Sequence, residues 1–123
     1  MDIIISNTSG APIYEQIEMQ IREMILRGEL KAGDALPSMR TLAKDLRISM
    51  ITTKRAYEEL ERDGFIESFT GRGSFVKAQN EELLREQILS ETEEIFSKGV
   101  KKGRDAGLTP DELLEIFQML LSE

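Results

Sequence analysis

The segment from Leu36 to Val76 constrains the fold most, because it holds two short amphipathic stretches, a tight turn between them and a glycine-containing hairpin pattern. In the first stretch, Ser38 is a favourable helix N-cap, since its hydroxyl can accept a bond from a free backbone N–H. The apolar residues that follow recur at helical spacing: Leu42, Ala43 and Leu46. The sequence therefore predicts a short helix that starts after Ser38 and buries one face.

A second helix is predicted directly after a turn at Arg47 and Ile48. Ser49 is its expected N-cap, and Gly64 is expected to end it. The residues that follow the core-facing pattern i, i+3, i+4, i+7 are Thr53, Ala56, Tyr57 and Leu60. Two amphipathic helices joined by so short a turn are typical of a helix-turn-helix.

Strand-like runs at residues 65–68 and 74–76 flank a loop that contains Gly71, Arg72 and Gly73. The glycines allow the backbone to turn tightly and to approach another molecule closely. A plain hairpin turn is the alternative interpretation. After a helix-turn-helix, however, such a hairpin is typical of a wing, and we predict a mainly α fold with a small β-wing.

Further elements are expected on either side of this segment. A helix is predicted from Pro12 to Arg27, with Gly28 ending it in a left-handed conformation. The run from Ile3 to Ile5 is a candidate edge strand, and Gly33-Asp34 is a candidate turn. We predict that residues 1–78 form one winged helix-turn-helix domain.

Residues 79–123 are predicted to form two helices. A long polar helix starts at Asn80 and ends at Gly107, with Gly99 and Gly103 permitting close backbone approach. The segment from Thr109 to Glu112 is a complete capping box with a proline at the first helical position. The helix that follows is apolar around most of its circumference, so one antiparallel neighbour cannot cover it, and it needs a second partner.

A net charge of −7 disfavours DNA binding unless basic residues are concentrated in one part of the chain. Residues 1–78 carry eleven Lys and Arg against twelve Asp and Glu, whereas residues 79–123 carry five against eleven. Within residues 38–57 there are five basic residues and one acidic residue. The predicted DNA-facing segment is therefore basic, as phosphate neutralisation requires.

Several classes of function are disfavoured by composition. The chain has no cysteine and no histidine, which removes thiolate zinc sites, histidine bases and the common transition-metal ligands, so we expect no metal, no cofactor and no enzyme activity. The carboxylate pairs Glu58-Glu59 and Glu93-Glu94 are adjacent on helices and point to different faces. No apolar run is long enough for a membrane span, and no secretory signal pattern is present, so a cytoplasmic location is the expectation.

The candidate DNA contacts come from the starts of both central helices and from the hairpin loop. A recognition helix enters the major groove N-terminus first, so residues 49–55 are expected nearest the bases. Arg40 is placed to reach a guanine edge or a phosphate, and Arg72 a narrow minor groove. The plain alternatives are a solvated charged helix face and an exposed arginine paired with a carboxylate. The full candidate set is Ser38, Arg40, Ser49, Met50, Ile51, Thr52, Lys54, Arg55, Gly71, Arg72 and Gly73.

These motifs together resemble the GntR family of transcriptional regulators, and most closely its short YtrA-type subgroup. The shared pattern covers about sixty-five residues and comprises Pro12 to Ile17, Gly28 to Leu30, Gly33, Leu36 to Ser38, Arg40, Leu42-Ala43, Thr52-Thr53, Ala56-Tyr57, Leu60-Glu61, Gly64 to Ile66 and Gly71 to Val76. The resemblance implies a homodimer that binds an inverted-repeat operator as a repressor. It also implies that Arg40 contacts DNA, that residues 49–55 lie in the major groove and that Arg72 reaches the minor groove.

One departure from the family pattern bears on specificity. Many members have arginine or another polar residue where this chain has Met50 and Ile51, so apolar contact with thymine methyl groups is the expectation here.

The C-terminal region resembles the two-helix dimerisation unit of the YtrA type. It is too short for the large effector domains of other branches, and no convergent polar cluster marks an effector pocket. The expected dimer-interface residues are Leu84, Ile88, Ile95, Leu113, Phe117, Leu120 and Leu121.

Two functions from different classes remain open on the sequence. The first is a dimeric, sequence-specific DNA-binding repressor with recognition helix 49–63 and wing 65–76. The second is a protein-interaction module that keeps the winged fold without using DNA, which the net acidity and the apolar last helix favour. Under the second hypothesis, Arg40→Ala and Arg72→Ala would leave function intact.

Overall fold

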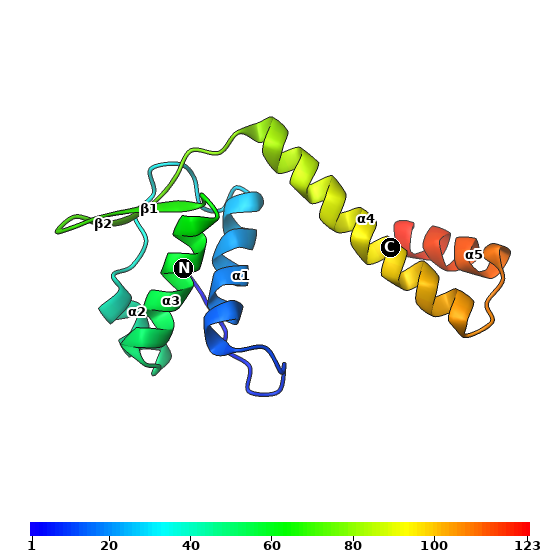
Figure 1. The fold of residues 1–123 in the computed structure, drawn as a ribbon, viewed down its shortest axis with the longest axis horizontal. Helices are drawn as coiled ribbons and strands as arrows, with labels where there is room; N and C mark the ends of the chain where they lie inside the picture. The colour runs from blue at the N-terminus through cyan, green and yellow to red at the C-terminus, as the bar shows by residue number, and fades with distance from the viewer. The chain divides into compact units, whose positions relative to one another are not determined.

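The computed structural model describes all 123 residues, which form two compact units, residues 1–80 and 81–123 (Figure 1). The first unit contains α1 (Ile13–Leu26), α2 (Met39–Leu46), α3 (Met50–Arg62), β1 (Ile66–Phe69) and β2 (Gly73–Val76). The second contains α4 (Glu81–Asp105) and α5 (Pro110–Leu121). The mainly α fold with a small two-stranded wing is as the sequence predicts.

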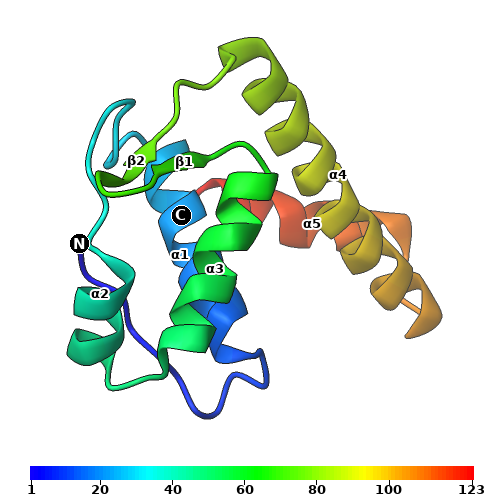
Figure 2. The same ribbon diagram turned by 60° about the vertical axis from the view of Figure 1, so that its left-hand side comes forward.

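The core of the first unit is built around α3, which packs against both α1 and α2 (Figure 2). The predicted stripe of α3 is buried along its whole length: Thr53, Ala56, Tyr57 and Leu60. On α1, Ile17 and Ile21 are also fully buried. Apolar periodicity alone therefore located the main packing interface of this unit.

The two helices of the helix-turn-helix begin with the same type of cap. Ser38 Oγ accepts a hydrogen bond from the Thr41 backbone N–H at 3.1 Å, and Ser49 Oγ accepts one from Thr52 at 3.1 Å. Arg47 ends α2 in the left-handed region at φ 57°, a conformation that non-glycine residues seldom adopt. This residue turns the chain sharply enough for α3 to start three residues later.

The wing is an antiparallel hairpin in which Ile66 pairs with Val76 and Phe69 pairs with Gly73. An isolated bridge between Ala35 and Phe75 ties it to the segment before α2. In that contact, the Leu36 backbone N–H donates to the Ser74 carbonyl at 2.9 Å. The wing is thus anchored at its base to the chain that leads into the helix-turn-helix.

The predicted edge strand at Ile3 to Ile5 is wrong, because this segment forms no strand. Its backbone groups instead pair with side chains of α1. The Ile4 N–H donates to Gln20 Oε1 at 2.9 Å, and Gln20 Nε2 donates to the Ile4 carbonyl at 2.8 Å. Gln16 pairs in the same way with both backbone groups of Ser6. These two amides satisfy the backbone groups that a neighbouring strand would otherwise have to satisfy.

Other predicted boundaries differ by about one residue. Pro12 is the N-cap of α1, not its first helical residue, and Arg27 is its C-cap. Gly28 and Gly64 follow their helices with φ near 80°, as predicted.

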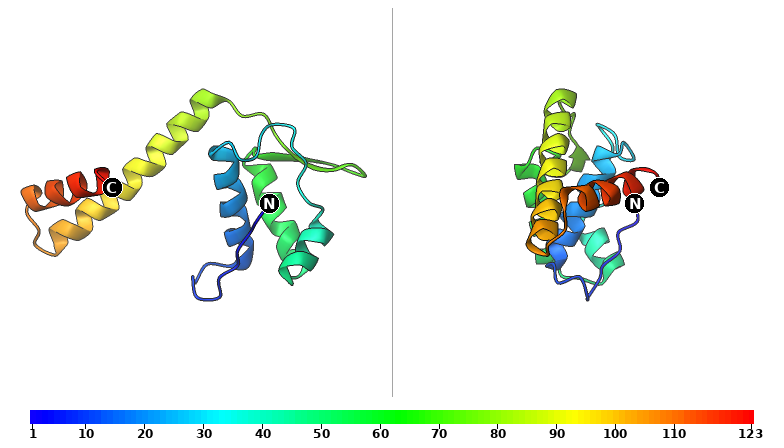
Figure 3. Two further views of the ribbon diagram at one scale, coloured as in Figure 1. Left: turned by 180° about the vertical axis from the view of Figure 1, so that it is seen from behind. Right: turned by 90° about the vertical axis from the view of Figure 1, so that its right-hand side faces the viewer.

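In the second unit, a turn at Gly107 folds α5 back toward α4, and the two helices cross at a wide angle (Figure 3). The predicted capping box is present, with Thr109 and Glu112 each bonded to the other's backbone N–H. Phe96 meets Phe117 edge to face at 5.4 Å between ring centroids. Gly103 is buried under Leu113, whereas Gly99 has no neighbour within 4 Å of where a Cβ would lie. Close packing on a glycine therefore occurs at Gly103 and not at Gly99 within this unit.

The apolar surface of the second unit is largely uncovered. No residue of α5 is buried, and Gly103 is the one buried residue of α4. The exposed large apolar side chains are Leu83, Ile88, Leu89, Ile95, Phe96, Val100, Leu114, Ile116, Phe117, Met119, Leu120 and Leu121. None of the five helices of the chain combines the length and apolar character that a bilayer span requires.

Candidate nucleic-acid interface

The start of α3 presents two large apolar side chains to solvent. Ile51 is 81% exposed and Met50 is 45% exposed, and both lie in the first turn after the Ser49 cap. Because both side chains are exposed, they are available for apolar contact with another molecule. The first turn of a recognition helix is the part that enters the major groove.

The hydroxyl groups beside this pair are already engaged within the chain. Ser49 Oγ caps α3 and also lies 2.8 Å from Thr52 Oγ1. At the start of α2, the Ser38 hydroxyl donates to Thr41 Oγ1 at 2.8 Å. These groups fix the backbone at the two helix N-termini, which leaves Met50 and Ile51 as the side chains that project from the start of α3.

Arg40 lies in the first turn of α2, is exposed, and forms no ion pair within the chain. The alternative of an arginine neutralised by a neighbouring carboxylate therefore does not apply to it. The same holds for Lys44 on the next turn of α2. Their donors are available to phosphate oxygens, which take charge-assisted hydrogen bonds.

The two basic residues on α3 are in different environments. Lys54 lies 3.9 Å from Glu58 in an exposed pair one helical turn apart, an interaction that contributes little in water. The Arg55 guanidinium instead lies over the ring of Tyr14, with its central carbon 3.9 Å from the ring centroid. Arg55 is thus attached to the first turn of α1.

The tip of the wing is a three-residue turn, Thr70 to Arg72, closed by a hydrogen bond from the Arg72 N–H to the Phe69 carbonyl at 2.9 Å. Gly71 has φ 79° and Gly73 has φ 106°, which a side chain would strain. Arg72 lies between them, exposed and without an ion pair. The turn therefore presents one cationic side chain on a narrow backbone.

Tyr57 holds α3 to the start of the helix-turn-helix. Its ring is 1% exposed, and its hydroxyl donates to the Pro37 carbonyl at 2.7 Å. Burial raises the pKa of Tyr57 above its ordinary value, because the phenolate would lose its hydration. This bond fixes the position of the residue just before the Ser38 cap.

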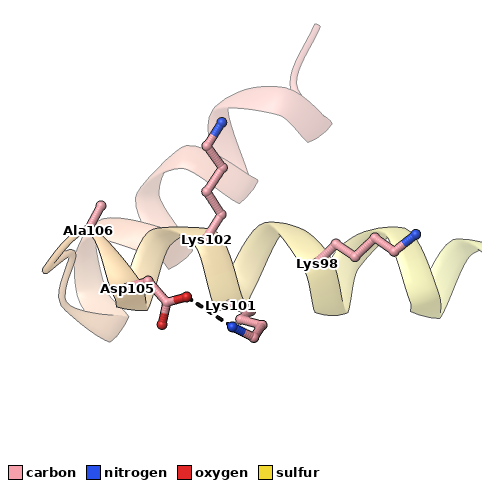
Figure 4. Close-up of a pocket in the computed structure, with 5 residues that line it drawn as sticks. All are labelled: Lys98, Lys101, Lys102, Asp105 and Ala106. Atoms are coloured by element: carbon pink, nitrogen blue, oxygen red, sulfur yellow. Dashed lines mark hydrogen bonds and ion pairs between the residues drawn. The ribbon is translucent and has the colours of Figure 1, made fainter.

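Two hollows of the surface lie along α4. An open one of about 510 Å³ is lined by Lys98, Lys101, Lys102, Asp105 and Ala106 (Figure 4). Its lysine side chains fan out in different directions, and Lys101 is paired with Asp105 at 3.0 Å. These lysines do not converge on one point, so the hollow is a groove on a helix surface. No group of three or more acidic residues is placed to hold a metal ion.

Residues 13–76 match the family model described as bacterial regulatory proteins of the gntR family. These residues are just over half of the chain and contain all of α1, the helix-turn-helix and the wing. The chain belongs to the GntR family.

The relatives of this GntR-family chain place it in the YtrA-type subfamily. The HTH-type transcriptional repressor YtrA of Bacillus subtilis is 37% identical over 113 residues, which cover 92% of this chain and 87% of the relative. The structure of YtrA from Sulfolobus acidocaldarius, a GntR-family transcription factor, superposes with a TM-score of 0.60 at 41% sequence identity. The match covers 73% of this chain and 95% of the Sulfolobus chain. The DNA-binding domain of AraR in complex with operator ORX1 shares the fold, with a TM-score of 0.55 at 23% identity over 62% of this chain and 95% of that one.

As a GntR-family member, the chain is a DNA-binding transcriptional regulator. Its structure places the predicted contact residues at three sites of the first unit: the start of α2, the start of α3 and the wing tip. The wing and α2 lie on the side of this unit opposite α1 (Figures 1 and 3). The sequence did not reveal the stack between Tyr14 and Arg55, because helical spacing assigned Tyr14 to the apolar face of α1.

Proposed function

We propose that the protein is a dimeric repressor that binds an inverted-repeat operator through the recognition helix and the wing. The observation that carries this proposal is the exposed Met50-Ile51 pair at the start of α3, with the unpaired Arg40 on α2 and Arg72 on the wing. The apolar pair contacts base edges in the major groove, and the two arginines bind phosphates or the minor-groove edge. Repression follows from occupying the operator.

The uncovered helices of the second unit support the dimer. A chain of 123 residues that leaves α5 without a single buried residue requires a partner for that helix. A second copy is the simplest partner, since a two-fold axis lets the same apolar surface meet itself. A two-fold dimer in turn matches an inverted repeat, whose half-sites lie about one helical turn, or a multiple of it, apart.

We further infer that the protein acts without catalysis or a bound cofactor and works in the cytoplasm, in the same compartment as its operator. Its curated relatives are transcriptional regulators. Any effector would have to bind at the dimer interface or against the winged unit.

Operator binding at increasing salt tests this proposal. A fragment selected from a random DNA pool should be retarded at low salt, with log affinity falling linearly with log salt concentration. Arg40→Ala and Arg72→Ala should each weaken binding, and a lost phosphate contact should reduce the salt slope by about one. Arg27→Ala removes the same charge from the end of α1 and is the matched control. A protein that enriches no fragment, or whose Arg40 and Arg72 variants bind like Arg27→Ala, contradicts the proposal.

A further inference from the structure

The stack of Arg55 on Tyr14 joins the recognition helix to α1 at the edge of the candidate interface. Tyr14 is the second residue of α1, and Arg55 lies in the second turn of α3. The two helices lie side by side with their N-terminal ends toward the same end of the unit (Figure 2). At 3.9 Å from the ring centroid, the guanidinium is within contact distance of the aromatic face.

The stack leaves the hydrogen-bonding groups of Arg55 available. Stacking uses the face of the guanidinium, whereas its five N–H groups lie in the plane. Arg55 forms no ion pair within the chain, although the neighbouring basic residues Lys54 and Arg62 both do. Its donors are therefore free while its orientation is held.

The position of the stack favours a phosphate over a base as the partner. A base-reading side chain must extend from the start of the recognition helix into the groove, as is proposed for Ile51. Arg55 is instead held against Tyr14 in the first turn of α1. Phosphates line the edges of the groove, and a planar guanidinium suits their oxygens in a two-point contact.

We propose that Tyr14 is a positioning residue that holds Arg55 to clamp a backbone phosphate of the bound operator. The inference rests on the proposed function, since it names a further contact of the same interface. Tyr14 restricts the rotamers of Arg55 in the free protein, so Arg55 loses less conformational entropy when it binds the phosphate. The phosphate contact is thereby strengthened. Arg55 then contributes affinity and register, while the sequence preference arises at Met50 and Ile51.

A double-mutant cycle on operator affinity tests this coupling, with a fragment selected from a random pool as the probe. Arg55→Ala should weaken binding about tenfold or more, as for a lost hydrogen bond to a charged group. Tyr14→Leu keeps the apolar volume, removes the aromatic face, and should weaken binding about two- to fivefold. The double variant should bind no worse than Arg55→Ala, and Tyr14→Phe should restore most of the loss.

Two further readouts separate a positioning role from a structural one. Arg55→Ala should reduce the salt slope by about one and weaken binding equally across single-base variants of the operator. Thermal unfolding of Tyr14→Leu should match that of the unmodified protein. Additive losses in the cycle, or a changed preference at one base pair in Arg55→Ala, would overturn the inference.

The failure of this inference can be told from the failure of the proposed function. If Arg40→Ala and Arg72→Ala weaken binding while the Tyr14 and Arg55 variants do not, the clamp alone is rejected. If none of the four positions affects binding, the proposed interface itself is rejected.

Discussion

At the scale of single residues, the proposed DNA interface contains both apolar and cationic side chains, which would have different roles. Ile51 has no structural task in the winged unit, because four-fifths of its surface is exposed. Arg40 and Arg72 have no ion-pair partner within the chain. Cationic side chains on phosphates give affinity that is independent of sequence, so in the proposed interface the first turn of α3 discriminates between operators.

Replacing Ile51 with alanine should weaken operator binding by about 1 kcal/mol, because part of an isoleucine side chain no longer leaves water on binding. If Ile51 contacts thymine methyl groups, operator DNA with deoxyuridine in place of thymidine should bind the unmodified protein less tightly. The same DNA change should have little further effect on Ile51→Ala. Titration of both proteins with both DNAs measures this coupling, and equal losses on the two proteins would contradict the contact. Unfolding should be unchanged.

Ionisation of the buried Tyr57 hydroxyl should destabilise the winged unit at alkaline pH. Because its pKa is raised in the folded state, the protonated form favours folding. That contribution is complete below the unfolded-state pKa of about 10 and is lost as pH rises through the folded-state pKa. Tyr57→Phe should lack this pH-dependent loss and should be about 1 kcal/mol less stable at pH 7, since the Pro37 carbonyl loses its donor.

Urea unfolding of both proteins between pH 7 and 11 tests the effect. Tyr14→Phe is the control, because the second tyrosine of the chain is not fully buried. If the free energy of unfolding decreases equally with pH in Tyr57→Phe and in the unmodified protein, Tyr57 does not cause the loss of stability at alkaline pH.

At the scale of secondary structure elements, features encoded within a few residues were predictable and features that depend on distant partners were not. Ser38, Ser49 and Thr109 cap helices through neighbours three residues away, so sequence spacing sufficed. The run from Ile3 to Ile5 has strand-forming residues, but the backbone groups of Ile4 and of the following Ser6 pair with two glutamine side chains of α1, which no strand pattern reveals. The Tyr14–Arg55 stack spans 41 positions and was missed for the same reason.

The two glycines of α4 should respond differently to alanine. A Cβ at Gly103 would lie 2.5 Å from Leu113 Cδ2, whereas one at Gly99 would meet nothing within 4 Å. Gly99→Ala should therefore gain about 1 kcal/mol from helix propensity alone. Gly103→Ala should be about 1–3 kcal/mol less stable than Gly99→Ala, because Leu113 must move or the two helices must separate. Unfolding at one fixed protein concentration compares them, and equal stabilities would show that Leu113 adapts at no cost.

At the scale of the whole molecule, the two units differ in charge and in surface. Residues 1–78 are close to neutral, whereas residues 79–123 carry most of the net negative charge. The acidic residues of the second unit repel phosphates, and most of its large apolar side chains remain exposed in the single chain. In the proposed dimer, DNA contact belongs to the first unit and assembly to the second, which reconciles a pI near 4.8 with a DNA-binding regulator.

Assembly through α5 can be tested at Phe117 and Leu120. Phe117 is 38% exposed and also packs on Phe96, so Phe117→Asp should disrupt both the helical pair and the dimer. Leu120 is 59% exposed, so Leu120→Asp should yield monomers while leaving the helical pair folded. Gln118→Asp is the matched control, because it places the same charge on the same helix at a polar position.

Light scattering should show monomers for Phe117→Asp and Leu120→Asp and dimers for Gln118→Asp. Operator affinity should fall on the order of 100-fold or more in the monomers, because each half-site must then be bound without the tether that raises the effective concentration of the second domain. Binding to a single half-site should remain unchanged, since the helix-turn-helix and wing are untouched. If Leu120→Asp remains dimeric, the dimer interface does not lie on α5 at this position. If a monomeric variant keeps full operator affinity, binding to the inverted repeat does not require the dimer.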